Sequence, residues 1–111
     1  MFGFLKRTHI ANKAKQKTVK KFKQLGIAMS FWHGALWIPP YSIGLWIFFR
    51  TDAAFERYLA DGTTREITEF YWATLKELGY PDEFIHQSGV AFGSKETVDR
   101  DYQGNYYYYV K

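Results

Sequence analysis

The side chains that could carry catalytic chemistry are carboxylates, and their spacing does not assemble a reaction centre. Glu66 and Glu69 lie three residues apart in a predicted helix that also holds Glu77, so they share one side and could act as general acid and base. That side is opposite the apolar stripe of the same helix, and a solvated surface explains the three residues better. We therefore expect no catalytic residues and a protein that is not an enzyme.

The histidines and the loop motifs predict neither a metal site nor a cofactor. His9, His33 and His86 are too far apart in sequence to place two ligands on one element, so only folding could bring His33 and His86 together. The segment GSKET at positions 93–97 lacks the glycine-rich loop of a phosphate site. Cysteine is absent, which excludes thiolate ligands and favours a reducing compartment, here taken as the cytoplasm.

Positive charge is concentrated in the first part of the chain. The net charge is +4, yet residues 1–51 hold nine Lys and Arg and no acid, whereas residues 52–111 hold six basic and eleven acidic residues. A basic arm attracts phosphates, anionic lipids or acidic proteins, so nucleic-acid binding through this arm is one alternative function. A solvated leader that keeps the chain soluble is the other interpretation. The candidate anion-binding residues are Lys13, Lys15, Lys17, Lys20, Lys21 and Lys23.

Aromatic residues make up 21% of the chain, which favours a contact surface. Large rigid side chains bury much area at little entropic cost. Sheet faces rich in them have more apolar area than one layer of helices can cover. The leading hypothesis is a small non-enzymatic protein-binding module of the inhibitor, immunity or regulatory type, whose partner is another protein or a second copy of the chain. The candidate contact residues are Trp32, Trp37, Trp46, Tyr106, Tyr107, Tyr108 and Tyr109.

An uncharged run of 26 residues separates Lys23 from Arg50, apart from His33. It is long enough to cross a bilayer as a helix, but Pro39 and Pro40 remove two backbone donors in its middle. The alternation of apolar residues on both sides of these prolines favours two strands of a covered sheet. We favour the strands, and a membrane-attached protein held through residues 25–49 remains the other alternative function.

The strongest signal for a single element is that for a long helix over residues 64–78. Thr63 and Glu66 form a capping box in front of a helical apolar stripe that Gly79 ends. The rest of the pattern predicts helices over 8–25, 53–60 and 94–102 and strands over 85–92 and 106–110.

Together these elements predict an α+β fold in a single small domain. We expect a mainly antiparallel sheet of about four strands, with the long helix 64–78 packed on one face. A basic N-terminal arm or helix, residues 1–24, precedes the α+β domain, residues 25–111. A chain of 111 residues buries enough surface for one core without disulfides.

Overall fold

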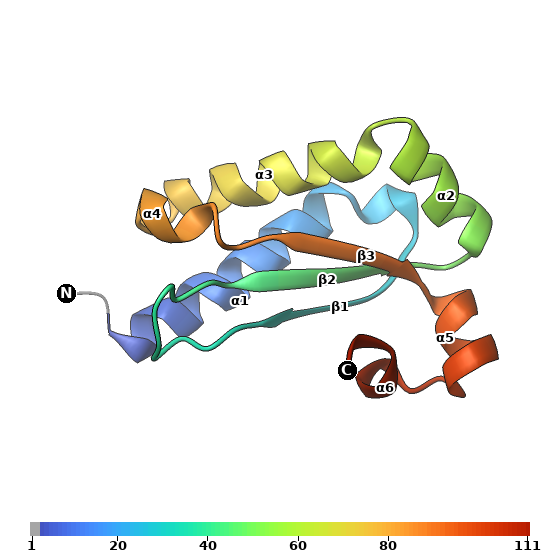
Figure 1. The fold of residues 1–111 in the computed structure, drawn as a ribbon. Helices are drawn as coiled ribbons and strands as arrows, with labels where there is room; N and C mark the ends of the chain where they lie inside the picture. The colour runs from blue at the N-terminus through green and yellow to red at the C-terminus, as the bar shows by residue number, and fades with distance from the viewer. Residues whose placement is uncertain (1–2) are drawn as a thin grey trace.

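A three-stranded sheet lies between two unequal layers of helix in the computed structural model, which describes residues 3–111 (Figure 1). Strands β1 (Ile27–His33) and β2 (Gly44–Phe49) are antiparallel neighbours. Strand β3 (Val90–Ser94) pairs with the other side of β2 and runs parallel to it. The chain therefore forms one α+β domain around a mixed sheet.

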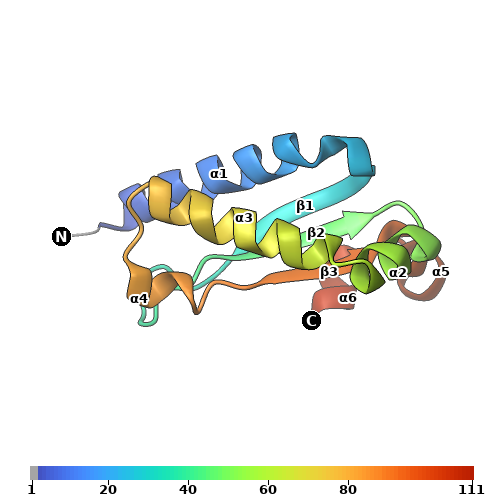
Figure 2. The same ribbon diagram turned by 90° about the horizontal axis from the view of Figure 1, so that it is seen from above.

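Three helices cover one face of the sheet, which we call the covered face. Helices α1 (Phe4–Lys21) and α3 (Thr63–Glu77) run side by side along it, and α2 (Asp52–Ala60) lies at one end (Figure 2). The connections contain the short helices η1 (Lys23–Leu25) and α4 (Asp82–Ile85). Helices α5 (Lys95–Tyr102) and α6 (Tyr106–Val110) follow β3, and α6 lies on the other side of the sheet from α3.

The hydrophobic core lies between the covered face and its helices. Leu45, Ile47 and Phe49 are 0% exposed, because alternate residues of β2 point to the same side. Residues three or four apart in each helix share the side that meets them. The buried helical side chains are Ile10, Ala11 and Ala14 of α1 and Ile67, Tyr71 and Leu75 of α3.

The basic residues from Lys6 to Lys21 belong to helix α1, which contributes directly to this core, and Lys23 begins η1. The helix predicted over 8–25 starts earlier, at Phe4, and ends at Lys21. The 3-10 turn η1 follows, and Gly26, with φ at 78°, ends it in the left-handed conformation that glycine adopts most readily.

The long helix predicted over 64–78 is α3, Thr63–Glu77, which is shifted by one residue at each end. The capping box predicted for it is wrong. Gly62 is the N-cap residue of α3 and offers no side chain. Asp61 caps instead, because its Oδ1 accepts hydrogen bonds from the backbone N–H of Thr63 at 2.9 Å and from the Thr63 hydroxyl at 2.6 Å. Asp61 thus accepts the Thr63 N–H that the Glu66 side chain would accept in a capping box.

The expectation of a mainly antiparallel sheet of about four strands is wrong in two respects. Residues 106–110 form helix α6, because the Asn105 side chain accepts a hydrogen bond from the Tyr108 N–H and satisfies the first turn. The strand predicted over 85–92 is β3, shifted to Val90–Ser94, and it returns parallel to β2 after the crossover through α2, α3 and α4.

The uncharged run forms the centre of this fold. It supplies β1, β2 and the loop between them, with Pro39 and Pro40 in the loop. Within residues 3–111 no helix combines the length and the apolar character that crossing a bilayer requires.

Candidate partner-binding face

The second face of the sheet, which we call the aromatic face, consists of alternate residues of the three strands. The strand register places on it the side chains that point away from α1 and α3. Among them, His33 is the one ionisable group. The residues are Met29, Phe31 and His33 of β1, Trp46 and Phe48 of β2, and Ala91 and Gly93 of β3.

Helix α6 covers one end of the aromatic face with two of its four tyrosines. The rings of Trp46 and Phe48 stack with their centroids 5.3 Å apart. Tyr109 meets both edge-on, at 5.7 Å from Trp46 and 5.5 Å from Phe48, and Tyr106 lies 4.7 Å from Phe48. Phe48 is 0% exposed as a result. Tyr106 and Tyr109, three residues apart on one side of the helix, therefore act as a cover.

Gly93 makes the docking of α6 sterically feasible. A Cβ atom at this position would lie 3.0 Å from the Phe48 ring and 3.1 Å from the Tyr109 hydroxyl oxygen. Both distances are shorter than ordinary carbon contacts. A side chain at position 93 would therefore displace α6 or the Phe48 ring.

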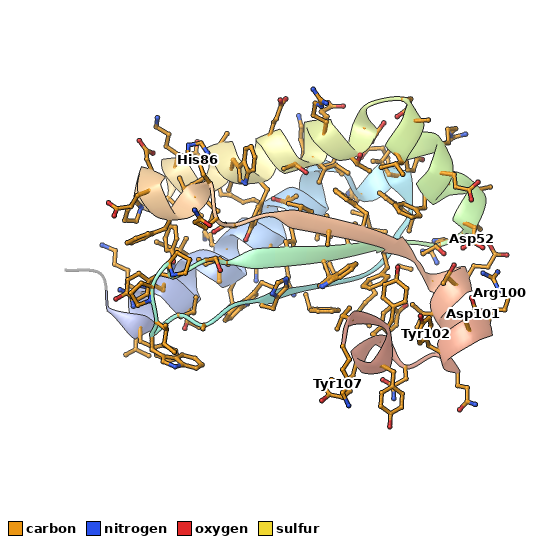
Figure 3. All side chains as sticks on the ribbon, in the orientation of Figure 1. Asp52, His86, Arg100, Asp101, Tyr102 and Tyr107 are labelled. Atoms are coloured by element: carbon orange, nitrogen blue, oxygen red, sulfur yellow. The ribbon has the colours of Figure 1, made fainter. Side chains whose placement is uncertain are left out.

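An ion-pair and hydrogen-bond cluster at Asp52 fixes the start of α5, and through it α6. The Asp52 carboxylate accepts hydrogen bonds from the Ser94 hydroxyl, from the Thr97 hydroxyl at 2.6 Å and from Arg100 Nη1 at 3.0 Å. These three donors, in that order, lower the pKa of Asp52 to about 2. Figure 3 shows Asp52 and Arg100 together where α2 meets α5.

The rest of the aromatic face is open. Met29 is 39% exposed, and Phe31, Trp46 and Ala91 are half-buried. His33 is exposed on its outer side while its ring lies over Gly44, and this partial burial lowers the pKa of the imidazole. An apolar strip therefore crosses from β1 to β3 beside the part that α6 covers.

Strand β1 is an edge of the sheet, and apart from an irregularity near its start it carries none of the usual protection. Its sequence, IAMSFWH, contains no Lys, Arg, Asp, Glu or Pro, the residues with which proteins discourage strand addition. Its seven residues are all partly or fully exposed, and the one irregularity lies near its start, between Ile27 and Met29. The outer backbone groups of β1 are thus an open template next to the aromatic face.

The structure separates the residues predicted to contact a partner. Trp46, Tyr106 and Tyr109 come together on the aromatic face, as described above. Trp32 points to the covered face, where its indole N–H donates to Asn12 Oδ1 at 2.8 Å. Trp37 lies in the β1–β2 loop and is 65% exposed.

Tyr107 and Tyr108 point away from the sheet, with exposures of 65% and 59%. Figure 3 shows Tyr107 on the outer side of α6. Sequence reasoning did not select Met29, Phe31 or His33. The alternation within β1 puts these three on one side, but only the strand register puts that side next to Trp46.

The lysines of α1 lie on the helical layer, away from the aromatic face. Lys17 Nζ is 3.5 Å from Glu77 Oε1, and Lys21 Nζ lies 5.8 Å above the Phe70 ring. With Lys20, these residues line a groove of about 580 Å³ between α1 and α3. Within residues 3–111, no acidic side chain forms an ion pair with Lys13, Lys15, Lys20 or Lys23.

The histidines have separate environments. His33 lies against Gly44, whereas the ring of His86 packs edge-on against Trp72 with centroids 5.9 Å apart. In the part of the chain that the structure describes, no three His, Asp or Glu side chains are grouped as metal ligands would be.

The comparisons found no protein-family model, no curated protein and no solved structure that matches the chain.

Proposed function

We propose that this protein is a small non-enzymatic module that binds another protein through the β1 edge and the aromatic face. The observation that carries the proposal is the incomplete cover of this face. The covered face buries Leu45, Ile47 and Phe49 completely, whereas Met29 of the aromatic face, in the edge strand β1, remains 39% exposed. A contiguous apolar surface next to open backbone donors and acceptors is the form of a strand-addition site.

In this mode a strand of the partner pairs with β1 and extends the sheet. Main-chain hydrogen bonds to β1 supply affinity, and alternate side chains of the added strand point toward the aromatic face. There they can pack beside Met29 and Phe31, with Trp46 behind them. Large aromatic side chains in such a position commonly dominate binding energy.

The chemistry of the face selects the kind of partner segment. Burying an unpaired charge is costly, and this face offers no fixed charge to pair with one. The partner strand should therefore present uncharged, apolar residues on the side that meets Phe31 and Trp46. A second copy of the chain, pairing β1 with β1, meets the same requirement. The absence of cysteine supports a cytoplasmic setting for the interaction.

Site-specific photocrosslinking in the cells that make the protein tests the proposal. A photoreactive residue replaces Met29 in one variant and Leu59, which is 59% exposed on α2, in the matched control. We expect the Met29 variant to crosslink one discrete protein, or a second copy of the chain, and the Leu59 variant to lack that product.

A charge-introducing pair of variants then links the product to the face. Phe31→Lys places an ammonium group on the aromatic face, and Leu59→Lys places one on exposed α2. We expect Phe31→Lys to abolish the Met29 crosslink while Leu59→Lys retains it, with unchanged far-UV circular dichroism in both. An equally strong crosslink from position 59, or a Met29 crosslink that survives Phe31→Lys, contradicts the proposal.

A further inference from the structure

One end of the molecule displays four large apolar side chains to solvent. Phe4 and Leu5 begin α1 and are 50% and 81% exposed, and Trp37 and Ile38 of the β1–β2 loop are 65% and 53% exposed. The rings of Phe4 and Trp37 lie 6.3 Å apart, so the two segments meet. Figures 1 and 2 both place the start of α1 and this loop at the same end. We call these four residues the apolar tip.

The fold holds the apolar tip outward, because the loop is anchored on both sides of Trp37 and Ile38. Before them, Leu36 is 1% exposed and its carbonyl oxygen accepts a hydrogen bond from Arg7 Nη1 at 2.6 Å. After them, the guanidinium of Arg7 lies 4.0 Å above the ring of Tyr41. With its neighbours fixed in this way, the loop cannot easily turn Trp37 and Ile38 into the core.

A glycine and a tyrosine hydroxyl fix the same loop further. Gly34 has φ at 152°, and a Cβ atom there would lie 2.1 Å from the Ser42 carbonyl oxygen, so no other residue fits this closure. The hydroxyl of Tyr80 donates to the Tyr41 carbonyl oxygen. The exposure of the tip is thus a property of the folded domain.

Positive charge continues from the apolar tip along the outward side of α1. Lys13 and Lys20 are exposed and lie two turns apart on one side of the helix. Leu5 shares that outward half, opposite the buried Ile10 and Ala14. A single flat surface can therefore contact Leu5, Lys13 and Lys20 at once. Neither α1 nor the β1–β2 loop holds an acidic residue that would oppose an anionic surface.

The apolar tip and the lysines of α1 together favour a lipid surface over a nucleic acid as the ligand. Lysines attract both, but the aliphatic side chains of Leu5 and Ile38 have no π-face on which a base could stack. Trp, Phe and aliphatic residues flanked by lysines are typical of elements that lie in the membrane interface. Peripheral attachment also generally needs two signals, and apolar insertion combined with basic charge supplies both.

We propose that the apolar tip and the outward lysines of α1 bind the surface of an anionic phospholipid bilayer. Trp37, Ile38, Phe4 and Leu5 enter the interfacial region, and Lys13 and Lys20 meet the headgroup phosphates and carboxylates. The β1 edge and the aromatic face remain available to a protein partner. This attachment is independent of the protein-binding function proposed above.

Co-sedimentation of the full chain with vesicles tests the inference. The probes are vesicles of phosphatidylcholine alone and of phosphatidylcholine with about a quarter phosphatidylserine, because added anionic headgroups strengthen the attraction of basic residues. We expect binding to the phosphatidylserine vesicles that weakens with salt. Trp37→Ser/Ile38→Ser and Lys13→Glu/Lys20→Glu should each lower the affinity by about tenfold or more.

Two control variants distinguish binding by the apolar tip and the outward lysines of α1 from nonspecific adsorption and from an effect of net charge alone. Leu59→Ser removes an exposed apolar side chain from α2 at the other end of the molecule, and Arg65→Glu reverses an exposed charge on α3. Both should retain wild-type binding, as should Phe31→Lys on the aromatic face. Loss of binding in Leu59→Ser equal to that in the tip variant overturns the inference. So does tighter binding to a fluorescent single-stranded oligonucleotide than to the phosphatidylserine vesicles.

Discussion

The two faces of the sheet contain similar residue types but receive very different cover. On the covered face, α1 and α3 have 18 and 15 residues, or about 27 and 22 Å of helix, which matches the length of a seven-residue strand. On the aromatic face, α6 has five residues, or about 7 Å. On the covered face the β2 residues Leu45, Ile47 and Phe49 are therefore 0% exposed, whereas Met29 of the aromatic face remains 39% exposed.

The difference in cover indicates that the two faces have different roles. A fully buried side chain contributes its whole transfer free energy to folding, whereas a half-buried one retains apolar area that a partner can still remove from water. Stability should depend mainly on the covered face, and binding mainly on the open part of the aromatic face. Four substitutions test this division.

The largest effect is expected for Phe49→Ala on the covered face. Phe49 is 0% exposed and its ring meets Phe55, Tyr58 and Phe92. Its removal should lower the free energy of unfolding by about 3 to 5 kcal/mol. Urea denaturation followed by circular dichroism measures this loss, and a value below about 1 kcal/mol would show that the core is not where we place it.

Gly93→Ala should have the next largest effect, and a local one. The new methyl group would meet the Phe48 ring and the Tyr109 hydroxyl, so overpacking should cost about 1 to 3 kcal/mol. We expect faster amide exchange in α6 and unchanged exchange in β2. Uniform acceleration across the sheet, or none in α6, would contradict the role of α6 as a separate cover.

Phe31→Ala should affect stability less, because its half-buried ring keeps part of its area in water. The expected loss is about 1 kcal/mol or less in the free energy of unfolding, whereas the crosslink from position 29 should disappear. Comparison of urea midpoints with crosslinking yields separates the two effects. A loss as large as that of Phe49→Ala would mean that the two faces do not differ.

The smallest effect is expected for Asp52→Asn, because solvent screens this cluster. The ordinary pKa of Asp52, 3.8, falls to about 2 in the folded protein. Its stabilising contribution is therefore complete above the ordinary pKa and is lost as the pH falls through about 2. The melting temperature of the wild type should exceed that of Asp52→Asn near neutral pH, and the gap should close in strong acid. A gap that persists at the lowest pH would contradict this linkage.

The helices with strong local signals could be predicted from the sequence. Gly26 ends the N-terminal helical segment, and the Ser94 side chain caps α5 by accepting from the Thr97 N–H at 3.1 Å. These signals act within a few residues, so composition and spacing reveal them.

The tyrosine run is different, because alternation at period two predicts a strand while Asn105 supplies a helix cap. Contacts of Tyr106 and Tyr109 with Phe48 favour the helix.

The candidate site could be predicted only in part, because it depends on contacts between distant segments. The sequence identified Trp46 and the tyrosines as an aromatic surplus. It could not show that Trp32 turns toward Asn12 or that Phe31 lies beside Phe48, since both depend on the register of β1 against β2.

The sequence by itself determined the α+β class, the basic character of α1 and the apolar nature of both strands in the uncharged run. Tertiary structure alone decided that β3 runs parallel to β2, which side of each strand is covered, and that Phe4 meets Trp37 at one end. The physical reason is the separation in sequence over which each kind of interaction acts. Caps and periodicity act over one or two helical turns, whereas strand register and helical cover are set by the packing of residues that are tens of positions apart.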